Sequence, residues 1–216
     1  MRDGRGEDYP TLPPAHPSSA PRGLPLYEAR ARVGTAVTIE TVRLTLRELG
    51  AEDAPFVQVL YNDRDFLANV GDRGVRSLED ARRYIADGPV RSYRQHGFGL
   101  YLMVARDSGE PVGMCGLLRR DWHGEVEIGF ALLPAARLKG YALEAGAAVL
   151  EFARASLALE RVVALTAPDN QGSIRVLERL GFRFARMVRA PDAPGDSRLF
   201  VWLPSPGAGP KTLKFP

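Results

Sequence analysis

Residues 125–142 are Glu125-Val-Glu-Ile-Gly-Phe-Ala-Leu-Leu-Pro-Ala-Ala-Arg-Leu-Lys-Gly-Tyr-Ala142. Their first part has the two-residue period of a strand with one apolar face, formed by Val126, Ile128 and Phe130. Glu127 has the opposite parity, so we expect it to face away from the local core. The second part is a basic loop that leads into an apolar helical run.

The loop at residues 137–141, here called the anion loop, has the composition of an anion site. The first amides of the helix that follows have no intrahelical acceptor, and the helix dipole adds partial positive charge there. Gly140 lets the backbone approach a ligand or adopt a positive φ angle, while Arg137 and Lys139 contribute formal charge. A solvated basic helix start is the alternative, because short basic glycine loops are weak motifs on their own.

The whole chain of 216 residues has the composition of one globular domain, with 45% apolar and 25% charged residues. Its net charge of +3 comes from interspersed basic and acidic residues rather than a basic stripe, which argues against nucleic-acid binding. The single cysteine, Cys115, excludes a disulfide framework and a cysteine metal cluster, so we expect a reduced, cytoplasmic compartment and no metal. No apolar segment reaches the ~18 residues that span a bilayer, so we expect a soluble protein without a membrane partner.

The two ends of the chain differ in composition from its middle. Residues 1–36 are rich in proline and glycine and lack a sustained apolar period, which predicts a flexible extension. A docking segment through Leu24, Leu26 and Tyr27 is the alternative for this region. Residues 37–204 are predicted to form the folded domain, and residues 205–216 a mobile tail.

Apolar periods and turn residues predict a series of helices and strands across the middle of the chain. In order, these are a strand at 38–49, helices at 52–61 and from Ser77, strands at 99–105, 112–118 and 124–130, a helix at 143–157, a strand at 161–166, a helix capped by Asp169 or Asn170, and strands at 182–188 and 197–203. Val42, Leu44 and Leu46 are expected on the buried face of the first strand. The polar connection at 62–74 is expected to be a surface loop or to line a site.

The order of these elements predicts the fold class. Turn signals join the three middle strands as an antiparallel meander. The helix between the third of them and the next strand makes that pair parallel if both share a sheet. We therefore predict a mixed α/β (α+β) fold, with a central mixed, mostly antiparallel sheet of about seven strands flanked by helices.

Four motifs in this order resemble the GNAT superfamily of acyl-CoA-dependent N-acyltransferases. They are Arg137-Leu-Lys-Gly-Tyr-Ala142, the preceding Glu127-Ile-Gly-Phe-Ala-Leu-Leu-Pro134, Asp169-Asn170 with Ser173, and Val176-Leu-Glu-Arg-Leu-Gly-Phe182. The resemblance covers about residues 38–203. Within the superfamily, the second and third motifs are similar to the branch that contains ribosomal-protein N-terminal acetyltransferases.

The resemblance implies that the strands before and after the anion loop splay apart and form a cleft for acetyl-CoA, used as a co-substrate. Backbone groups around residues 130–132 would pair with the pantetheine arm, and amides of residues 138–142 would hold the pyrophosphate. The implied cofactor-binding residues are Phe130, Ala131, Leu132, Arg137, Leu138, Lys139, Gly140, Tyr141, Ala142, Asn170 and Ser173.

The same resemblance suggests catalytic roles. Glu127 is the predicted general base, acting through water, with a glutamate in a surface ion pair as the alternative. The backbone amide near Phe130 or Ala131 is the predicted donor to the oxyanion. Leu177 stands where many family members have a tyrosine acid, so Ser173 is the remaining catalytic candidate, beside a capping role for both Ser173 and Asn170.

Several other side chains have less specific patterns. Cys115 lies in an apolar strand, which favours a core position over a covalent acyl carrier. His96 and His123 are expected at the surface. Trp122 and Tyr141 are equally explained by packing and by contact with a ligand.

The resemblance implies an N-acetyltransferase that moves an acetyl group to a primary amine by direct transfer in a ternary complex. The acceptor is either a protein N-terminus or a small-molecule amine, next to a wall formed by residues 66–74 and the last hairpin. The protein is expected to be a monomer or a homodimer. A non-catalytic acyl-CoA-binding or regulatory module is the alternative, for which the missing tyrosine is the one argument.

Overall fold

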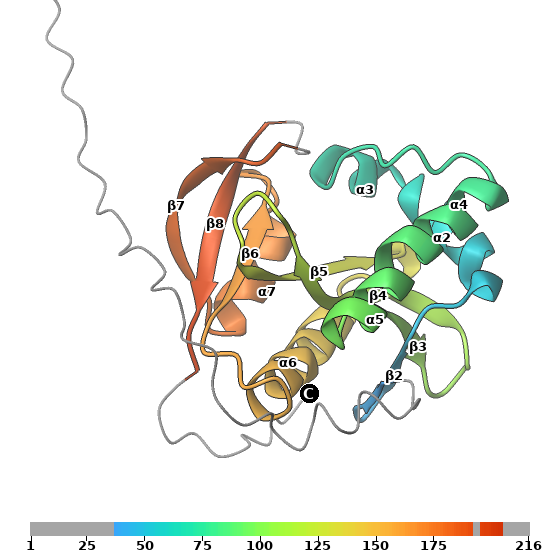
Figure 1. Ribbon diagram of the computed structural model, residues 1–216, viewed down its shortest axis with the longest axis horizontal. Coiled ribbons are helices and arrows are strands. Elements are labelled where there is room, and N and C mark those ends of the chain that lie inside the picture. Colours follow the sequence, from blue (N-terminus) through green and yellow to red (C-terminus); the bar gives the residue numbers. More distant parts are fainter. Residues whose placement is uncertain (1–36, 192–194, 205–216) are drawn as a thin grey trace, which may run out of the picture. The chain divides into compact units, whose positions relative to one another are not determined.

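The computed structural model describes residues 37–191 and 195–204, which form one mixed sheet with helices packed on it (Figure 1). Its strand order is β1-β2-β3-β4-β5-β6-β8-β7. The strands are β1 Thr38–Glu40, β2 Leu44–Arg47, β3 Leu100–Ala105, β4 Pro111–Arg119, β5 Val126–Leu132, β6 Val162–Thr166, β7 Arg183–Arg189 and β8 Asp196–Trp202. The helices are η1 Ala51–Asp53, α2 Ala54–Tyr61, α3 Arg64–Asn69, α4 Leu78–Ile85, η2 Ala86–Val90, α5 Arg91–His96, η3 Pro134–Ala136, α6 Tyr141–Ala155 and α7 Gln171–Arg179. The predicted extension at 1–36 and tail at 205–216 lie outside the described residues.

The strand pairing confirms the predicted fold class. Strands β3, β4 and β5 form the antiparallel meander, and β5 pairs in parallel with β6 after the α6 crossover. The other neighbouring pairs are antiparallel. The described sheet has eight strands rather than about seven, because the predicted first strand forms two.

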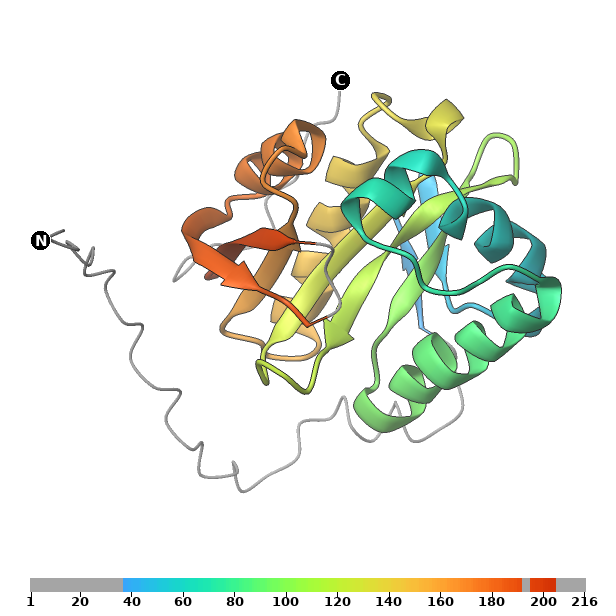
Figure 2. The same cartoon turned by 90° about the horizontal axis from the view of Figure 1, so that it is seen from above.

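Helices cover both faces of the sheet (Figure 2). One apolar cluster joins α6 and α7 to one face and includes Leu44 and Leu46, both fully buried. A second cluster joins α2, α3 and α4 to the other face around Leu102 and Met114. Each such side chain contributes roughly 1.5–3 kcal/mol when it leaves water, so the two clusters hold the helices on the sheet.

The first predicted strand is wrong in its continuity, because it breaks at residues 41–43. Strand β1 folds back on β2, with Ile39 opposite Leu46, and Val42 at the turn is 76% exposed instead of buried. The Thr41 hydroxyl accepts a hydrogen bond from the Leu44 amide at 2.9 Å. Such a side-chain contact competes with the strand ladder and closes a turn. An apolar alternation alone does not reveal it.

The polar connection at residues 62–74 contains a helix, α3, where the prediction had an irregular loop. Asp63 caps this helix, accepting hydrogen bonds from the amides of Asp65 at 3.2 Å and Phe66 at 3.1 Å. Phe66 packs on Tyr61 with ring centroids 4.3 Å apart, which fixes the short helix to α2. A single buried aromatic residue is too little to give a helical period in the sequence.

Other predicted signals are confirmed. Ser77 caps α4 and forms the capping box with Asp80, and Asn170 caps α7. No pattern in the sequence predicted η2 and α5, which prolong α4 through a π-helical turn that contains Pro89. Among the described residues, no helix is both long enough and apolar enough to cross a membrane.

Candidate active site

The central cleft opens where β5 and β6 part. The two strands pair at Glu127 and Val163, near the start of each. Beyond this point residues 128–131 of β5 and residues 164–166 of β6 line opposite sides of a cavity of about 260 Å³. The expected splayed strand pair is therefore present.

The register of β4 and β5 determines which backbone groups of β5 face this cleft. The Leu133 amide donates to the Val112 carbonyl at 3.0 Å, so these two residues form a hydrogen-bonded pair. Hydrogen-bonded pairs alternate along an antiparallel ladder, so Ala131 also directs its backbone at β4. The backbone groups of Phe130 and Leu132 consequently point to the opposite edge, on the side of β6.

A second, larger cavity of about 620 Å³ adjoins the first. The two share a wall formed by Phe66, Asn69, Val70, Phe130, Ala131, Asn170 and Ser173. The larger cavity extends along the anion loop and the start of α6, whereas the smaller one contains Glu127. One cleft thus has two compartments that meet at Phe130.

The backbone of the anion loop contains two residues with positive φ angles. Leu138 has a φ angle of +62° and Gly140 one of +80°, and both positions are in the left-handed region. Leu138 is fully exposed, so no apolar contact explains its strained conformation. Where left-handed residues alternate with right-handed ones, successive N–H groups turn to one side and make a concave anion site. Gly140 is also the N-cap of α6, so first-turn amides of that helix continue the row.

Basic side chains surround the larger cavity. Among the described residues, its lining includes one carboxylate, Asp65, and five basic residues: Arg43, Arg137, Lys139, Arg175 and Arg179. Arg137 forms ion pairs with Asp63 and Asp65, and its Nε donates to the Leu132 carbonyl at 3.1 Å. It therefore connects the anion loop to α3. Its contact with a pyrophosphate remains a prediction.

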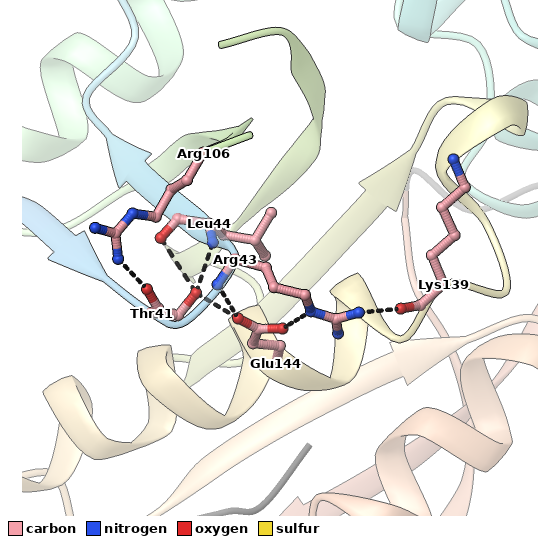
Figure 3. Close-up of polar contacts among 6 residues, drawn as sticks. All are labelled: Thr41, Arg43, Leu44, Arg106, Lys139 and Glu144. Atoms are coloured by element: carbon pink, nitrogen blue, oxygen red, sulfur yellow. Dashed lines mark hydrogen bonds and ion pairs between the residues drawn. The ribbon is translucent and has the colours of Figure 1, made fainter. Parts of the chain in front are cut away.

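A buried carboxylate stands beneath the loop. Glu144, 1% exposed, accepts hydrogen bonds from the Thr41 hydroxyl at 2.6 Å, the Arg43 amide at 2.8 Å and Arg43 Nε at 2.7 Å (Figure 3). Burial acts to raise the pKa of Glu144, but these hydrogen bonds and the arginine charge outweigh it and lower the pKa below its ordinary value of 4.5. Glu144 is therefore charged in the folded protein at neutral pH.

The lowered pKa of Glu144 predicts acid sensitivity. A second buried carboxyl, Asp53, behaves alike: burial raises its pKa, but bonds from Arg47 and the Gly50 amide bring it below 3.8. Because the unfolded chain takes up these protons first, the stabilisation is complete above about pH 5 and is lost as pH falls through the folded pKa values. Urea unfolding between pH 7 and pH 3 should show the free energy of unfolding decrease, by at most ~1.4 kcal/mol per pH unit for each proton taken up. In Glu144→Gln the free energy of unfolding should decrease less steeply with falling pH. An unchanged slope would contradict the lowered pKa of Glu144.

Glu127 lies on the predicted face of β5, but it is buried, not on an open surface. It is 4% exposed because α2, α3 and α4 cover that face of the sheet too. Arg120 Nε donates to its Oε2 at 2.8 Å. The ion pair weighed as an alternative is thus present, inside the smaller cavity and not at the surface. A carboxylate can hold such a pair and still present its second oxygen to a ligand.

His123 was predicted at the surface, and this prediction is wrong. Its side chain is 13% exposed, and its Nε2 lies 3.5 Å from Glu127 Oε2. Nδ1 accepts a hydrogen bond from the Glu125 amide at 3.1 Å, which assigns the proton of the neutral ring to Nε2, on the side of Glu127. Trp122 packs edge-on against the ring, with centroids 4.4 Å apart. The hairpin turn between β4 and β5 folds back over the strand, which local sequence does not show.

Hydroxyl groups line the smaller cavity near Glu127. The hydroxyls of Tyr61 and Tyr84 are 2.5 Å apart, and burial raises the pKa of both phenols, so both are neutral. Thr166 Oγ1 is buried and has no hydrogen-bond partner among the residues that the structure describes. Ser173 lines both cavities, as does Asn170.

The capping interpretation is confirmed for Asn170, whereas no side-chain cap by Ser173 is found among the described residues. Asn170 Oδ1 accepts a hydrogen bond from the Ser173 amide at 3.0 Å, so it completes the first turn of α7. Ser173 itself belongs to the wall that the two cavities share. Leu177 is 1% exposed and packs in the core, so an apolar side chain occupies the place of the family's tyrosine.

Cys115 is a core residue, as expected. It is fully buried in β4, and burial raises the pKa of its thiol to about 12. A thiol of this kind is a poor nucleophile at neutral pH. His96 is exposed, as predicted, and stacks on Phe98. Within the described part of the chain, no group of three or more histidine, cysteine or acidic residues is placed to hold a metal ion.

Comparisons with known proteins agree with this architecture. The family profile described as the Acetyltransferase (GNAT) domain matches residues 43–183. The chain belongs to this acetyltransferase family. Its relatives include the uncharacterized N-acetyltransferase YjdG of Bacillus subtilis, 36% identical over 104 residues that make up 48% of this chain and 62% of the relative. The resemblance inferred from the four motifs is confirmed.

Solved GNAT structures have the same fold. An acetyltransferase from Agrobacterium tumefaciens is 25% identical, with a TM-score of 0.66 over 78% of this chain and 95% of that one. RimL, a ribosomal-protein α-N-acetyltransferase solved in complex with coenzyme A, has a TM-score of 0.65 over 77% of this chain and 98% of its own, at 17% identity. At this identity, the similarity to RimL shows only that the two proteins share a fold.

Three arginines of the larger cavity were not predicted from the sequence. Arg175 and Arg179 lie one helical turn apart on α7, so the i, i+4 spacing after Asn170 was an available signal. Arg43 comes from the β1–β2 turn, about 100 residues before Glu144, and no local pattern connects the two.

Proposed function

We propose that this GNAT protein is an N-acetyltransferase that moves an acetyl group from acetyl-CoA to a primary amine by direct transfer in a ternary complex. The observation that carries the proposal is the two-compartment cleft. A basic compartment along the anion loop meets, at Phe130, a smaller compartment that contains one buried carboxylate, Glu127. Such a cleft suits an anionic donor on one side and a protonated amine on the other.

The residues of the larger compartment fit coenzyme A. A side chain at Gly140 would occupy the cradle, since its Cβ would lie 3.2 Å from Arg43 Nη2 at a φ angle of +80°. Amides of residues 138–142 would hold the pyrophosphate, with charge from Arg137 and Lys139. The backbones of Phe130 and Leu132, which point to the side of β6, would pair with the pantetheine arm. The predicted contribution of the Ala131 backbone is not proposed, because that backbone points to β4. Acetyl-CoA supplies the acetyl group in activated form, as a thioester.

In the smaller compartment, Glu127 would take the proton of the amine through a water molecule. An α-amine has a pKa of ~8 and a lysine-like amine one of ~10, so most acceptor molecules arrive protonated at neutral pH. Arg120 fixes the orientation of the carboxylate through Oε2. The Phe130 amide is the proposed donor to the negative charge that develops on the acyl oxygen.

Ser173 would donate a hydrogen bond to the leaving sulfur, a role supported by its place in the wall shared by both compartments. In this role Ser173 would act in place of the tyrosine that many family members have at the position of Leu177. A thiolate has a pKa of ~8.5 and is also protonated readily by water. The lack of a tyrosine at position 177 is therefore compatible with turnover.

The acceptor is proposed to be a protein N-terminus or a small-molecule amine. The proposed wall for it includes Phe66, Asn69, Val70 and Arg73, from α3 and the segment after it, which line the smaller cavity. The turn of the last hairpin, predicted as the other part of this wall, lies in part outside the described residues. We propose no nucleic-acid partner.

Release of free thiol tests the proposal. The full chain is incubated with acetyl-CoA and a panel of small amines, polyamines, amino acids and N-terminal peptides. Thiol release that requires one of these acceptors, with the acetylated product found by mass spectrometry, is the expected result. Tight binding of coenzyme A without turnover across the panel would instead favour an acyl-CoA-binding module. A chain that does not bind coenzyme A would contradict both.

A further inference from the structure

Arg43 connects the buried Glu144 to the backbone of the anion loop (Figure 3). Its Nε donates to Glu144 Oε2 at 2.7 Å, and its Nη1 donates to the Lys139 carbonyl at 2.9 Å. The guanidinium also lies over the Tyr141 ring, 5.0 Å from the centroid. One side chain from the β1–β2 turn therefore spans from the first turn of α6 to the loop before it.

The bond to the Lys139 carbonyl fixes the following amide. That carbonyl and the Gly140 N–H belong to one planar trans peptide, in which the two groups point in opposite directions. Gly140 has no side chain to restrain this peptide, and its φ angle of +80° is one of several that glycine adopts readily. Arg43 supplies the restraint, and Glu144 holds Arg43 in the rotamer that does so.

We propose that Arg43, held by Glu144, is a positioning residue for coenzyme A: it sets the direction of the Gly140 amide, one of the pyrophosphate donors. The inference rests on the proposed function for the identity of the ligand, but not on acetyl transfer. It assigns Arg43 an effect on the coenzyme through the backbone, in addition to any charge that it offers. Disorder of this peptide would raise the entropy that is lost when the coenzyme binds.

The chain contains a matched pair that separates this role from ordinary stabilisation. Arg47 and Asp53 also join an arginine of the first hairpin to a buried carboxylate, at 2.7 Å. Exposure of the side chains is 39% for Arg47 and 7% for Asp53, against 34% for Arg43 and 0% for Glu144. The Arg47 pair links β2 to η1 and makes no contact with the anion loop that the structure records. Asp53→Asn is therefore the control for Glu144→Gln.

The experiment measures the dissociation constant of coenzyme A by calorimetry and the urea midpoint for each variant. We expect Glu144→Gln and Asp53→Asn to lower the midpoint alike. Glu144→Gln should weaken coenzyme A about tenfold, as expected for one misdirected hydrogen bond to a charged group, and Asp53→Asn less than twofold. In the transfer assay the loss should appear in the KM for acetyl-CoA, with kcat at saturation unchanged.

Arg43→Lys provides a second variant in case Glu144→Gln fails to fold, because it keeps a positive charge beside the buried Glu144 carboxylate. Lysine keeps the charge, but it cannot bridge a carboxylate and a carbonyl as the guanidinium fork does. We expect it to weaken coenzyme A as much as Arg43→Gln does. Full affinity in Arg43→Lys, or equal losses in Glu144→Gln and Asp53→Asn, would overturn the inference. A wild-type chain that binds coenzyme A but acetylates no amine would refute the proposed function alone.

Discussion

Glu127→Gln is expected to lower kcat/KM for the amine acceptor by about 10²- to 10⁴-fold, the usual contribution of a general base. The glutamine side chain has nearly the same shape, so the dissociation constant of coenzyme A should stay within about twofold. The difference should also depend on pH. As pH approaches the pKa of the acceptor, more of the amine arrives unprotonated, and the rates of the two proteins should converge. Initial rates of thiol release between pH 6.5 and pH 9.5 measure this.

Glu125→Gln is the matched control for that substitution. Glu125 precedes β5 with the same strand parity, and its carboxylate pairs with Arg161 at 2.8 Å, much as Glu127 pairs with Arg120. Its side chain is 34% exposed and does not line the smaller cavity. We expect wild-type rates from Glu125→Gln at every pH. If Glu127→Gln retained full activity, or if its deficit were constant up to the pKa of the acceptor, Glu127 would be a structural ion-pair partner.

The sequence predicted the features of the cleft that depend on local periods and end signals. Alternation in β5 identified the face of Glu127 correctly, because side-chain direction in a strand follows parity alone. The caps at Ser77 and Asn170 were recognisable because a helix cap is completed within one helical turn. The parallel pairing of β5 with β6 followed from the intervening helix.

Burial and long-range partners could not be predicted in this way. Glu127 is buried because helices from residues 54–85 cover the second face of the sheet, which is a property of topology. The break at Thr41 depends on a carboxylate at Glu144, and the placement of Arg137 depends on Asp63 and Asp65 in an unpredicted helix. In the last two cases a polar side chain makes a contact that spans more than 70 residues of sequence.

Gly140→Asp is expected to weaken coenzyme A by about 100-fold, or ~2.7 kcal/mol. Two effects combine at this position. A side chain at a φ angle of +80° costs about 1 kcal/mol of backbone strain, and its Cβ would lie 3.2 Å from Arg43 Nη2. The carboxylate would then pair with Arg43 and place negative charge where the pyrophosphate is proposed to bind. Equilibrium dialysis or calorimetry measures the affinity, and urea unfolding the stability.

Two variants divide the effect into its parts. Gly109 has a φ angle of +74° in the β3–β4 turn, and a Cβ there would meet nothing within 4 Å. Gly109→Asp should therefore lose about the same stability as Gly140→Asp while its affinity for coenzyme A stays unchanged. Gly140→Asn has the same backbone requirement and nearly the same shape without the charge, so its affinity should fall between those of the wild type and Gly140→Asp. If Gly140→Asp bound coenzyme A like the wild type, the pyrophosphate would not bind at the anion loop. If Gly140→Asn were as weak as Gly140→Asp, the loss would come from the shape of the loop and not from its electrostatic field.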